Sequence, residues 1–252
     1  MKLAKFWSRD TAEYEGVQAS ARGWSDNSFE DAKAKARQVA HRVAERVVKY
    51  PGQKERYPYG DRPLPEPILK QFAGGSAAVT RNAYGALILN TDEMMFVDID
   101  SEGRRPPRVD INGIASRHGL SGRVYKTAGG LRLILTDRKF TPASAESEAL
   151  LQEFGADTMY THLCKMQMSF RARLTPKPWR CDLYKPNVKY PYETPRDERV
   201  FNDWLAKYNQ NAKEYATCEL TSTFGMQVLP GFGELIVYHD NETKAMSKLP
   251  LA

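Results

Sequence analysis

The chain has 252 residues, of which 41% are hydrophobic and 27% charged, as is ordinary for a globular protein with its own buried core. Its 37 lysines and arginines outnumber its 31 acidic residues, and the formal charge of +6 permits acidic partners such as nucleotides without requiring them. No apolar run approaches the roughly eighteen residues of a membrane span, and the first residues lack the apolar core of a signal peptide. We therefore expect a cytoplasmic protein with no membrane contact.

The sequence does not indicate sulfur or zinc chemistry. Cys164, Cys181 and Cys218 form no CxxC pair, and the four histidines are equally scattered. Such a set predicts buried or incidental thiols and offers no zinc-ligand spacing.

The first 75 residues are expected to form strands, a helix and a loop. Aromatic and polar residues mix over Lys2–Trp24, which predicts one or two strands. Ser28 is a helix N-cap, and alanines and valines recur at helical spacing from Phe29 to about Tyr50. The basic residues of this helix are more typical of a solvated surface than of a phosphate site. Prolines and glycines over Pro51–Pro67 predict an ordered loop.

Residues 76–182 are expected to form the core that carries the site, and residues 183–252 a helix and strand extension of the same single domain. The predicted elements are strands at Ala77–Asn90 and Glu93–Asp100, a helix at Val109–His118, a hairpin of Gly122–Thr127 and Leu131–Thr136, helices at Ser144–Phe154, Thr158–Leu174 and Asp197–Tyr215, and one or two strands within Glu219–Tyr238. This order predicts an α+β fold in which a mixed or antiparallel sheet of two hairpin units is backed by helices.

Two carboxylates end the apolar strand that reads MMFVDID. Asp98 and Asp100 are two residues apart, so a strand directs both side chains to the same face of the sheet. Like charges so placed repel each other unless a cation lies between them, and oxygen ligands suit a hard divalent ion. The pair therefore predicts a Mg²⁺ or Mn²⁺ site, although solvated or arginine-paired acids would give the same pattern.

A glycine turn with an arginine follows about thirty residues later. In the run TAGGLR, Gly129 and Gly130 allow close backbone approach, and successive N–H groups at such a turn can bind an anion. Arg132 can donate two hydrogen bonds to a phosphate, with Lys126 and Thr127 beside the turn. An ordinary hairpin with a surface arginine is the alternative.

A second cationic segment reads FRARLTPKPWR. It combines a tryptophan with four cations on a turn stiffened by prolines. Cations are favourable near a helix C-terminus, but that effect does not account for all four of them together with the tryptophan. An aromatic ring among arginines can stack on a base while the cations hold phosphates. The candidate ligands of phosphate or base are Arg171, Arg173, Lys177, Trp179 and Arg180.

The Asp98–Asp100 strand end, followed by the turn Thr127–Arg132 into a strand, resembles the catalytic core of archaeo-eukaryotic primases and primase-polymerases. The resemblance covers about Ala77–Asp137 and implies an RRM-related core, with Asp98 and Asp100 as metal ligands and Arg132 as a catalytic residue. It departs from the family where Thr127 replaces serine, Ala128 replaces the first glycine, and Arg132 replaces the histidine that contacts the triphosphate.

The family also uses a third acidic residue on a later strand, for which Asp137 and Asp240 are the candidates. Over its whole length the chain also resembles a widespread, uncharacterised family of bacterial proteins. The runs that carry this second resemblance are YGDRPL, TRNAYGALILNT, VYKTAGGLRLI and SFRARLTPKPWRC. It implies no activity.

Together these features predict a divalent-metal-dependent domain that binds nucleotide or transfers nucleotidyl groups on nucleic acid. Lys126 and Arg132 would hold a nucleoside triphosphate, and the later cations a template strand or second phosphate. Two alternatives stay open at this point. One is a metal-dependent nuclease or phosphohydrolase that uses the same carboxylates, and the other is a non-catalytic module that binds nucleic acid or a protein partner.

Overall fold

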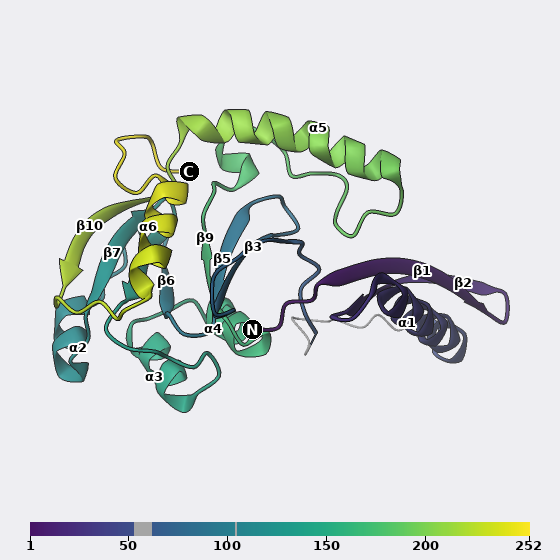
Figure 1. Cartoon of the computed structure of the whole chain (residues 1–252), viewed down its shortest axis with the longest axis horizontal. Coiled ribbons are helices and arrows are strands. Elements are labelled where there is room, and N and C mark those ends of the chain that lie inside the picture. Colours follow the sequence, from purple (N-terminus) through teal and green to yellow (C-terminus); the bar gives the residue numbers. More distant parts are fainter. Residues whose placement is uncertain (53–61, 104) are drawn as a thin grey trace.

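An N-terminal ribbon and helix stand to one side of the molecule (Figure 1). The computed structural model describes residues 1–52, 62–103 and 105–252, so the middle of the loop expected at Pro51–Pro67 lies outside the described residues. Strands β1 (Phe6–Tyr14) and β2 (Val17–Ser25) pair antiparallel, and α1 (Phe29–Lys49) packs on one face of the ribbon. We call this unit, residues 6–49, the arm.

The arm is held together by an unusually close approach of helix to ribbon. The buried side of α1 consists of alanines at every fourth position, Ala32, Ala36, Ala40 and Ala44. A Cβ atom on Gly23 would lie 2.2 Å from the carbonyl oxygen of Ala32, so only glycine fits there. The expected N-cap is confirmed, because Ser28 Oγ accepts a hydrogen bond of 3.0 Å from the Asp31 backbone N–H.

The first of two larger sheets has four strands that all pair antiparallel. In spatial order they are β10 (Cys218–Phe224), β7 (Gly122–Thr127), β8 (Gly130–Leu135) and β6 (Phe96–Asp100). Helix α2 (Ile111–His118) connects β6 to β7, which therefore run parallel with β8 between them, a split βαβ unit. Helix α6 (Phe232–Thr243) packs on this sheet through His239, whose ring stacks on Phe96.

The second sheet is also antiparallel, and its order is β3 (Ile68–Gln71), β4 (Ala77–Arg81), β5 (Leu87–Thr91) and β9 (Phe170–Arg173). The remaining helices are α3 (Ala145–Glu153), α4 (Thr158–Gln167), α5 (Pro195–Asn211) and the short 3₁₀ turns η1 (Pro178–Arg180) and η2 (Ala212–Glu214). The expected α+β class, with antiparallel sheets backed by helices, is confirmed. None of the helices in the described parts of the chain has the length and apolarity to cross a membrane.

Three expected elements are wrong in ways that matter for the site. The helix expected over Thr158–Leu174 ends at Gln167, because Met168 takes a left-handed conformation with φ of 51°, and the chain then enters β9. The single strand expected at Ala77–Asn90 is the hairpin of β4 and β5. The tail Glu219–Tyr238, expected as one or two strands, contains one strand, β10, as expected, but its second half is helix α6, which was not expected. The three cysteines are buried free thiols, as expected.

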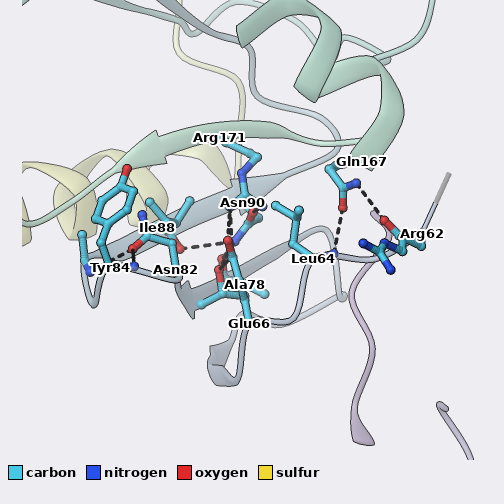
Figure 2. Close-up of polar contacts among 12 residues, drawn as sticks. Arg62, Leu64, Glu66, Ala78, Asn82, Tyr84, Ile88, Asn90, Gln167 and Arg171 are labelled. Carbon is cyan, nitrogen blue, oxygen red and sulfur yellow. Dashed lines mark hydrogen bonds and ion pairs between the residues drawn. The ribbon is translucent and has the colours of Figure 1, made fainter. Parts of the chain in front are cut away.

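A buried ion pair fastens the segment before β3 to the second sheet (Figure 2). Arg171 Nη2 donates to both carboxylate oxygens of Glu66, at 2.8 and 2.9 Å, and Arg171 Nη1 donates to Asn90 Oδ1 at 2.7 Å. Thr80 donates to the same carboxylate. Glu66 and Arg171 are 5% and 7% exposed, so each charge depends on the other for compensation.

Replacing Arg171 by methionine should therefore destabilise the fold strongly. The Glu66 carboxylate would stay buried without a cation, and we expect the free energy of unfolding to fall by about 3–5 kcal/mol in chemical denaturation. Arg117→Met is the matched control, because the ion pair of Arg117 with Glu153 is solvent-exposed and its loss should change the free energy of unfolding little. Similar losses in the two variants would contradict this account.

Candidate functional site

The two larger sheets meet at a buried arginine. Arg132 on β8 lies directly opposite Asp98 on β6, the edge strand of the first sheet. Its Nε and Nη2 donate to the two oxygens of Asp98 at 2.8 and 3.3 Å, and its Nη1 donates to the backbone carbonyl of Arg173 on β9, at 2.8 Å. Because β9 is an edge strand of the second sheet, this one side chain links both sheets.

The environment of Arg132 fixes its charge. The side chain is 1% exposed, and burial alone would lower its pKa, but the charge and hydrogen bonds of Asp98 outweigh burial and raise the pKa. Arg132 is thus a permanent cation whose hydrogen-bonding groups already have partners within the protein. A phosphate contact by Arg132 would have to compete with Asp98.

A glycine turn closes one side of the cleft that opens at this junction. Gly130 pairs with Asp100, and a Cβ atom on Gly130 would lie 2.0 Å from the backbone oxygen of Ile99. Glycine is therefore required for β6 to approach β8 so closely. A Cβ atom on Gly129 would lie 3.4 Å from Nη2 of Arg180, so the guanidinium of Arg180 lies against the turn.

The cleft has a volume of about 920 Å³ and is lined by most of the residues that the sequence singled out. The predicted residues in its wall are Asp98, Asp100, Lys126, Thr127, Gly129, Gly130, Arg132, Arg173, Lys177 and Arg180. Additional lining comes from Ser101, Pro106, Pro107 and Thr221, none of which the sequence reasoning assigned to the site. Segments as far apart in the chain as Asp98 and Thr221 thus meet at one place.

The cations of the cleft repel one another. Burial lowers the pKa of Lys177, and the charges of Arg173 and Arg180 lower it further. The pKa of Arg173 is likewise lowered by burial and then by the charge of Arg132, and its Nη1 is buried without a hydrogen-bond partner. An anion bound here would accept a hydrogen bond from Nη1 of Arg173 and would reduce the repulsion among Arg173, Lys177 and Arg180.

The acids of the cleft have two different environments. Asp98 forms an ion pair with Arg132. Asp100 is exposed, and its pKa is raised by the partial burial of its carboxylate and by the charges of Asp157 and Asp98. Asp157 is the N-cap of α4, and its backbone N–H donates to the carbonyl of Asp98 at 3.0 Å. Its proximity to Asp100 had no signal in the sequence.

The acids expected as a third ligand lie elsewhere. Asp137 accepts a hydrogen bond from the Ser121 backbone and pairs with Arg138, and Asp240 is held by Arg123 and Tyr125. Within residues 1–52, 62–103 and 105–252, no three Asp, Glu, His or Cys side chains are placed to hold a metal ion together. The Asp98/Asp100 metal site and the resemblance to primase-polymerases stay predictions.

Two predicted ligands do not line the cleft. Arg171 is buried against Glu66 on the second sheet, because β9 is a strand in which that position faces the Glu66–Asn90 network. Trp179 is 52% exposed on η1 and contacts Tyr84 edge-on, with ring centroids 5.3 Å apart. Lys177 Nζ lies 5.7 Å from the centroid of the Trp179 ring, so this ring is a neighbour of the cleft's cations.

The different environments of Asp98 and Asp100 predict opposite effects of the same substitution. Asp98→Asn should cost on the order of 2–3 kcal/mol of unfolding free energy at pH 7, because the buried charge of Arg132 loses its counter-ion while asparagine keeps one acceptor. Asp100→Asn should raise the melting temperature at pH 7, because the raised pKa of Asp100 means that its ionisation opposes folding above that pKa.

Thermal unfolding between pH 3 and pH 8 tests both expectations. The stabilisation by Asp100→Asn should vanish as the pH falls below about 4, the ordinary pKa of an aspartate in the unfolded chain, because Asp100 is then protonated in the folded and the unfolded protein alike. Destabilisation by Asp100→Asn at pH 7, or an unchanged melting temperature in Asp98→Asn, would show that the electrostatic account of the cleft is wrong.

No family model, curated protein or solved structure matches this chain. A functional assignment must therefore come from the chemistry of the cleft itself.

Proposed function

We propose that the cleft between the two sheets binds the phosphates of a nucleoside triphosphate or of a nucleic-acid strand. The observation that carries this proposal is the excess of cations over free acids. Once Arg132 is paired with Asp98, Asp100 is the one unpaired acid in a cleft that is also lined by Lys126, Arg173, Lys177 and Arg180. Phosphate is the common biological anion with enough charge and enough acceptor oxygens to satisfy such a group.

The shape of the lining supports a ligand with several phosphates. Lys126 and the Gly129 turn lie on one wall, while Arg173 and Lys177 lie on the other, and Arg180 contacts the turn from the second wall. A polyphosphate chain or successive phosphodiesters could engage cations along both walls. The exposed ring of Trp179, beside Lys177, is suited to stack on a nucleobase.

The acids bear on the role of a metal ion. Both oxygens of Asp98 accept hydrogen bonds from Arg132, which leaves Asp100, with Asp157 near it, as the carboxylate available to a cation. The mutual repulsion of these carboxylates is what a divalent ion would relieve. With Mg²⁺ bound, Asp100 and the phosphates would share the ion, and its charge would stabilise a leaving pyrophosphate. Nucleotidyl transfer is the reaction we propose for this arrangement.

The pairing of Asp98 with Arg132 favours a second candidate, a binding module without catalysis. A two-aspartate metal site needs both carboxylates, and here one of them already neutralises a buried guanidinium. In that case the cleft would bind phosphates without turnover. The two candidates share the ligand and differ in whether a metal ion changes its binding or supports a reaction.

Calorimetric titration with a nucleoside triphosphate, with and without Mg²⁺, tests the proposal. We expect Lys177→Gln to weaken binding at least tenfold, because a charge-assisted hydrogen bond contributes about 1.5–3 kcal/mol. Lys185→Gln is the matched control, since Lys185 is exposed eight residues further along and does not line the cleft. Its affinity should change less than about twofold.

The metal dependence separates the two candidates. If Asp100→Asn abolishes a Mg²⁺-dependent gain in affinity, and the wild-type protein extends a primed template while the variant does not, nucleotidyl transfer is supported. Binding without metal dependence or extension would leave the binding module. The absence of any triphosphate binding to the wild-type protein would refute the cleft as a phosphate site.

A further inference from the structure

The ribbon of the arm has an open edge along β1. Strands β1 and β2 form a sheet of two strands, and no third strand in the described parts of the chain pairs with either of them. Glu15 and Gly16 have positive φ angles of 46° and 79°, which is the conformation of a type I′ turn. The Tyr14–Val17 pair that flanks this turn is therefore hydrogen-bonded, and bonded and non-bonded pairs alternate from there along the ribbon.

This alternation identifies the backbone groups that the edge of β1 presents. Residues of the non-bonded pairs direct their N–H and C=O groups away from β2, and on β1 they are Trp7, Arg9, Thr11 and Glu13. Two of these groups bond to side chains of adjacent residues. The Thr11 N–H donates to Asp10 Oδ1 at 2.8 Å, and the Arg9 carbonyl accepts from Ser8 Oγ at 3.3 Å. The backbone of an added strand could take the place of both side chains.

Two cavities follow this edge from the base of the ribbon toward its tip, which extends away from the two larger sheets (Figure 1). The first has a volume of about 380 Å³, and its lining includes Trp7–Thr11 of β1 and Phe29 and Lys33 of α1. The second, of about 740 Å³, is lined by Ala12–Glu13 and by residues of α1 between Ala34 and Arg42. Together the cavities follow seven residues of β1, or roughly 23 Å of strand. We call this space between β1 and α1 the edge groove.

The α1 wall of the edge groove is basic. Residues 32–44 of α1 include four lysines and arginines and no aspartate or glutamate. Those that line the groove are Lys33, Arg37 and Arg42. Within the described residues, none of these three side chains forms an ion pair. The acids of the first turn of α1, Glu30 and Asp31, line neither cavity.

One of the three acids that line the groove shares the side of α1. The close approach at Gly23 places the Ser8–Gly23 pair on the helix side of the ribbon, so Asp10, two residues from Ser8, also faces that side. Glu13 faces the opposite side, and Glu193 forms an ion pair with Arg9. The helix side of the groove therefore has three cations against one carboxylate.

We propose that an extended acidic peptide of another protein adds to β1 in the edge groove as a third strand of the arm. The peptide backbone would bond to the outward N–H and C=O groups of β1, and every second side chain would face α1. Carboxylates at those alternate positions would lie against the cations of the α1 wall. Because an isolated two-stranded ribbon is only marginally stable, a third strand would also stabilise the arm.

The charge of α1 favours such a peptide over a second copy of this chain. If two copies paired through β1 about a two-fold axis, their ribbons would form one sheet with both α1 helices on the same face. The centres of the two ribbons would be two strand spacings apart, so the helices would lie about 10 Å from each other. Their basic flanks would then face and repel each other. The edge groove is distinct from the cleft between the two larger sheets and does not depend on the function proposed for that cleft.

Fluorescence anisotropy of two labelled octapeptides, (Glu-Thr)4 and (Lys-Thr)4, with the full chain tests the proposal. We expect the acidic peptide to bind at least tenfold more tightly than the basic one. Arg37→Glu should weaken binding of (Glu-Thr)4 at least tenfold, because it reverses a charge on the wall of the groove. Lys35→Glu is the matched control, since Lys35 is exposed on α1 and lines neither cavity. It should change the affinity less than threefold.

A second pair of variants distinguishes strand addition from attraction by charge alone. Thr11→Pro removes an outward N–H from the edge of β1 while the bonds between β1 and β2 stay, and it should abolish peptide binding. Gln18→Pro removes an outward N–H from the opposite edge of the ribbon, on β2, and should change the affinity less than threefold. The two charge variants should keep the wild-type melting temperature, so they decide the outcome even if a proline variant unfolds.

Four results would overturn the proposal. They are the absence of saturable binding of (Glu-Thr)4, equal affinities for the two peptides, equal losses in Arg37→Glu and Lys35→Glu, and equal losses in two folded proline variants. A dimer in sedimentation that Thr11→Pro dissociates would show instead that a second copy of the chain occupies the edge.

Discussion

The arrangement of the cleft depends on the guanidinium of Arg132. A buried arginine is costly unless its charge is compensated and its donors are satisfied, and this one meets both conditions with groups from two sheets. Asp98 provides the charge from β6, and the Arg173 carbonyl provides an acceptor from β9. These hydrogen bonds fix the distance between β6 and β9, the edge strands of the two sheets. The residues that follow Asp98 and Arg173 in sequence therefore lie on the two sides of the cleft.

That arrangement has an electrostatic consequence. Because Asp98 forms an ion pair with Arg132, its charge does not neutralise the cations of β9 and η1. Arg173 and Lys177 are left with lowered pKa values, and Nη1 of Arg173 is buried without a hydrogen-bond acceptor. The same contact that joins the sheets therefore leaves the cleft with an excess of cations, and Asp98 has a structural role while Asp100, two residues away, has no such partner.

Much of the site could be predicted from local patterns, whereas its internal pairing could not. The strand ending in Asp98 and Asp100, and the hairpin at Gly129–Gly130, follow from apolar alternation and turn chemistry, and the structure brings them together with Lys177 and Arg180. The burial of Arg132 was not visible, because it results from contact between two sheets whose packing no local pattern specifies.

The segment around Arg171 shows how one error in secondary structure changes the role of a residue. As part of a helix running to Leu174, Arg171 would have been one cation among several at a helix end. The left-handed turn at Met168 instead starts a strand, and strand pairing places Arg171 opposite Asn90 and beside Glu66. The partner of this buried charge is 105 residues away in sequence, a distance at which periodicity carries no information.

Helix α4 is hydrogen-bonded both to the strand that carries Asp98 and to the segments on either side of the arm. Its N-cap is Asp157, whose backbone N–H donates a hydrogen bond to the backbone carbonyl of Asp98, a residue that lines the cleft. Its last residue, Gln167, accepts through its carbonyl from Lys2, at the root of the arm, and its side chain holds the chain at Arg62 and Leu64. A helix of ten residues is a stiff rod of about 15 Å. The two ends of one short helix are thus hydrogen-bonded to the strand that carries Asp98 and to the segments on either side of the arm, so α4 fixes the distance between these parts of the chain.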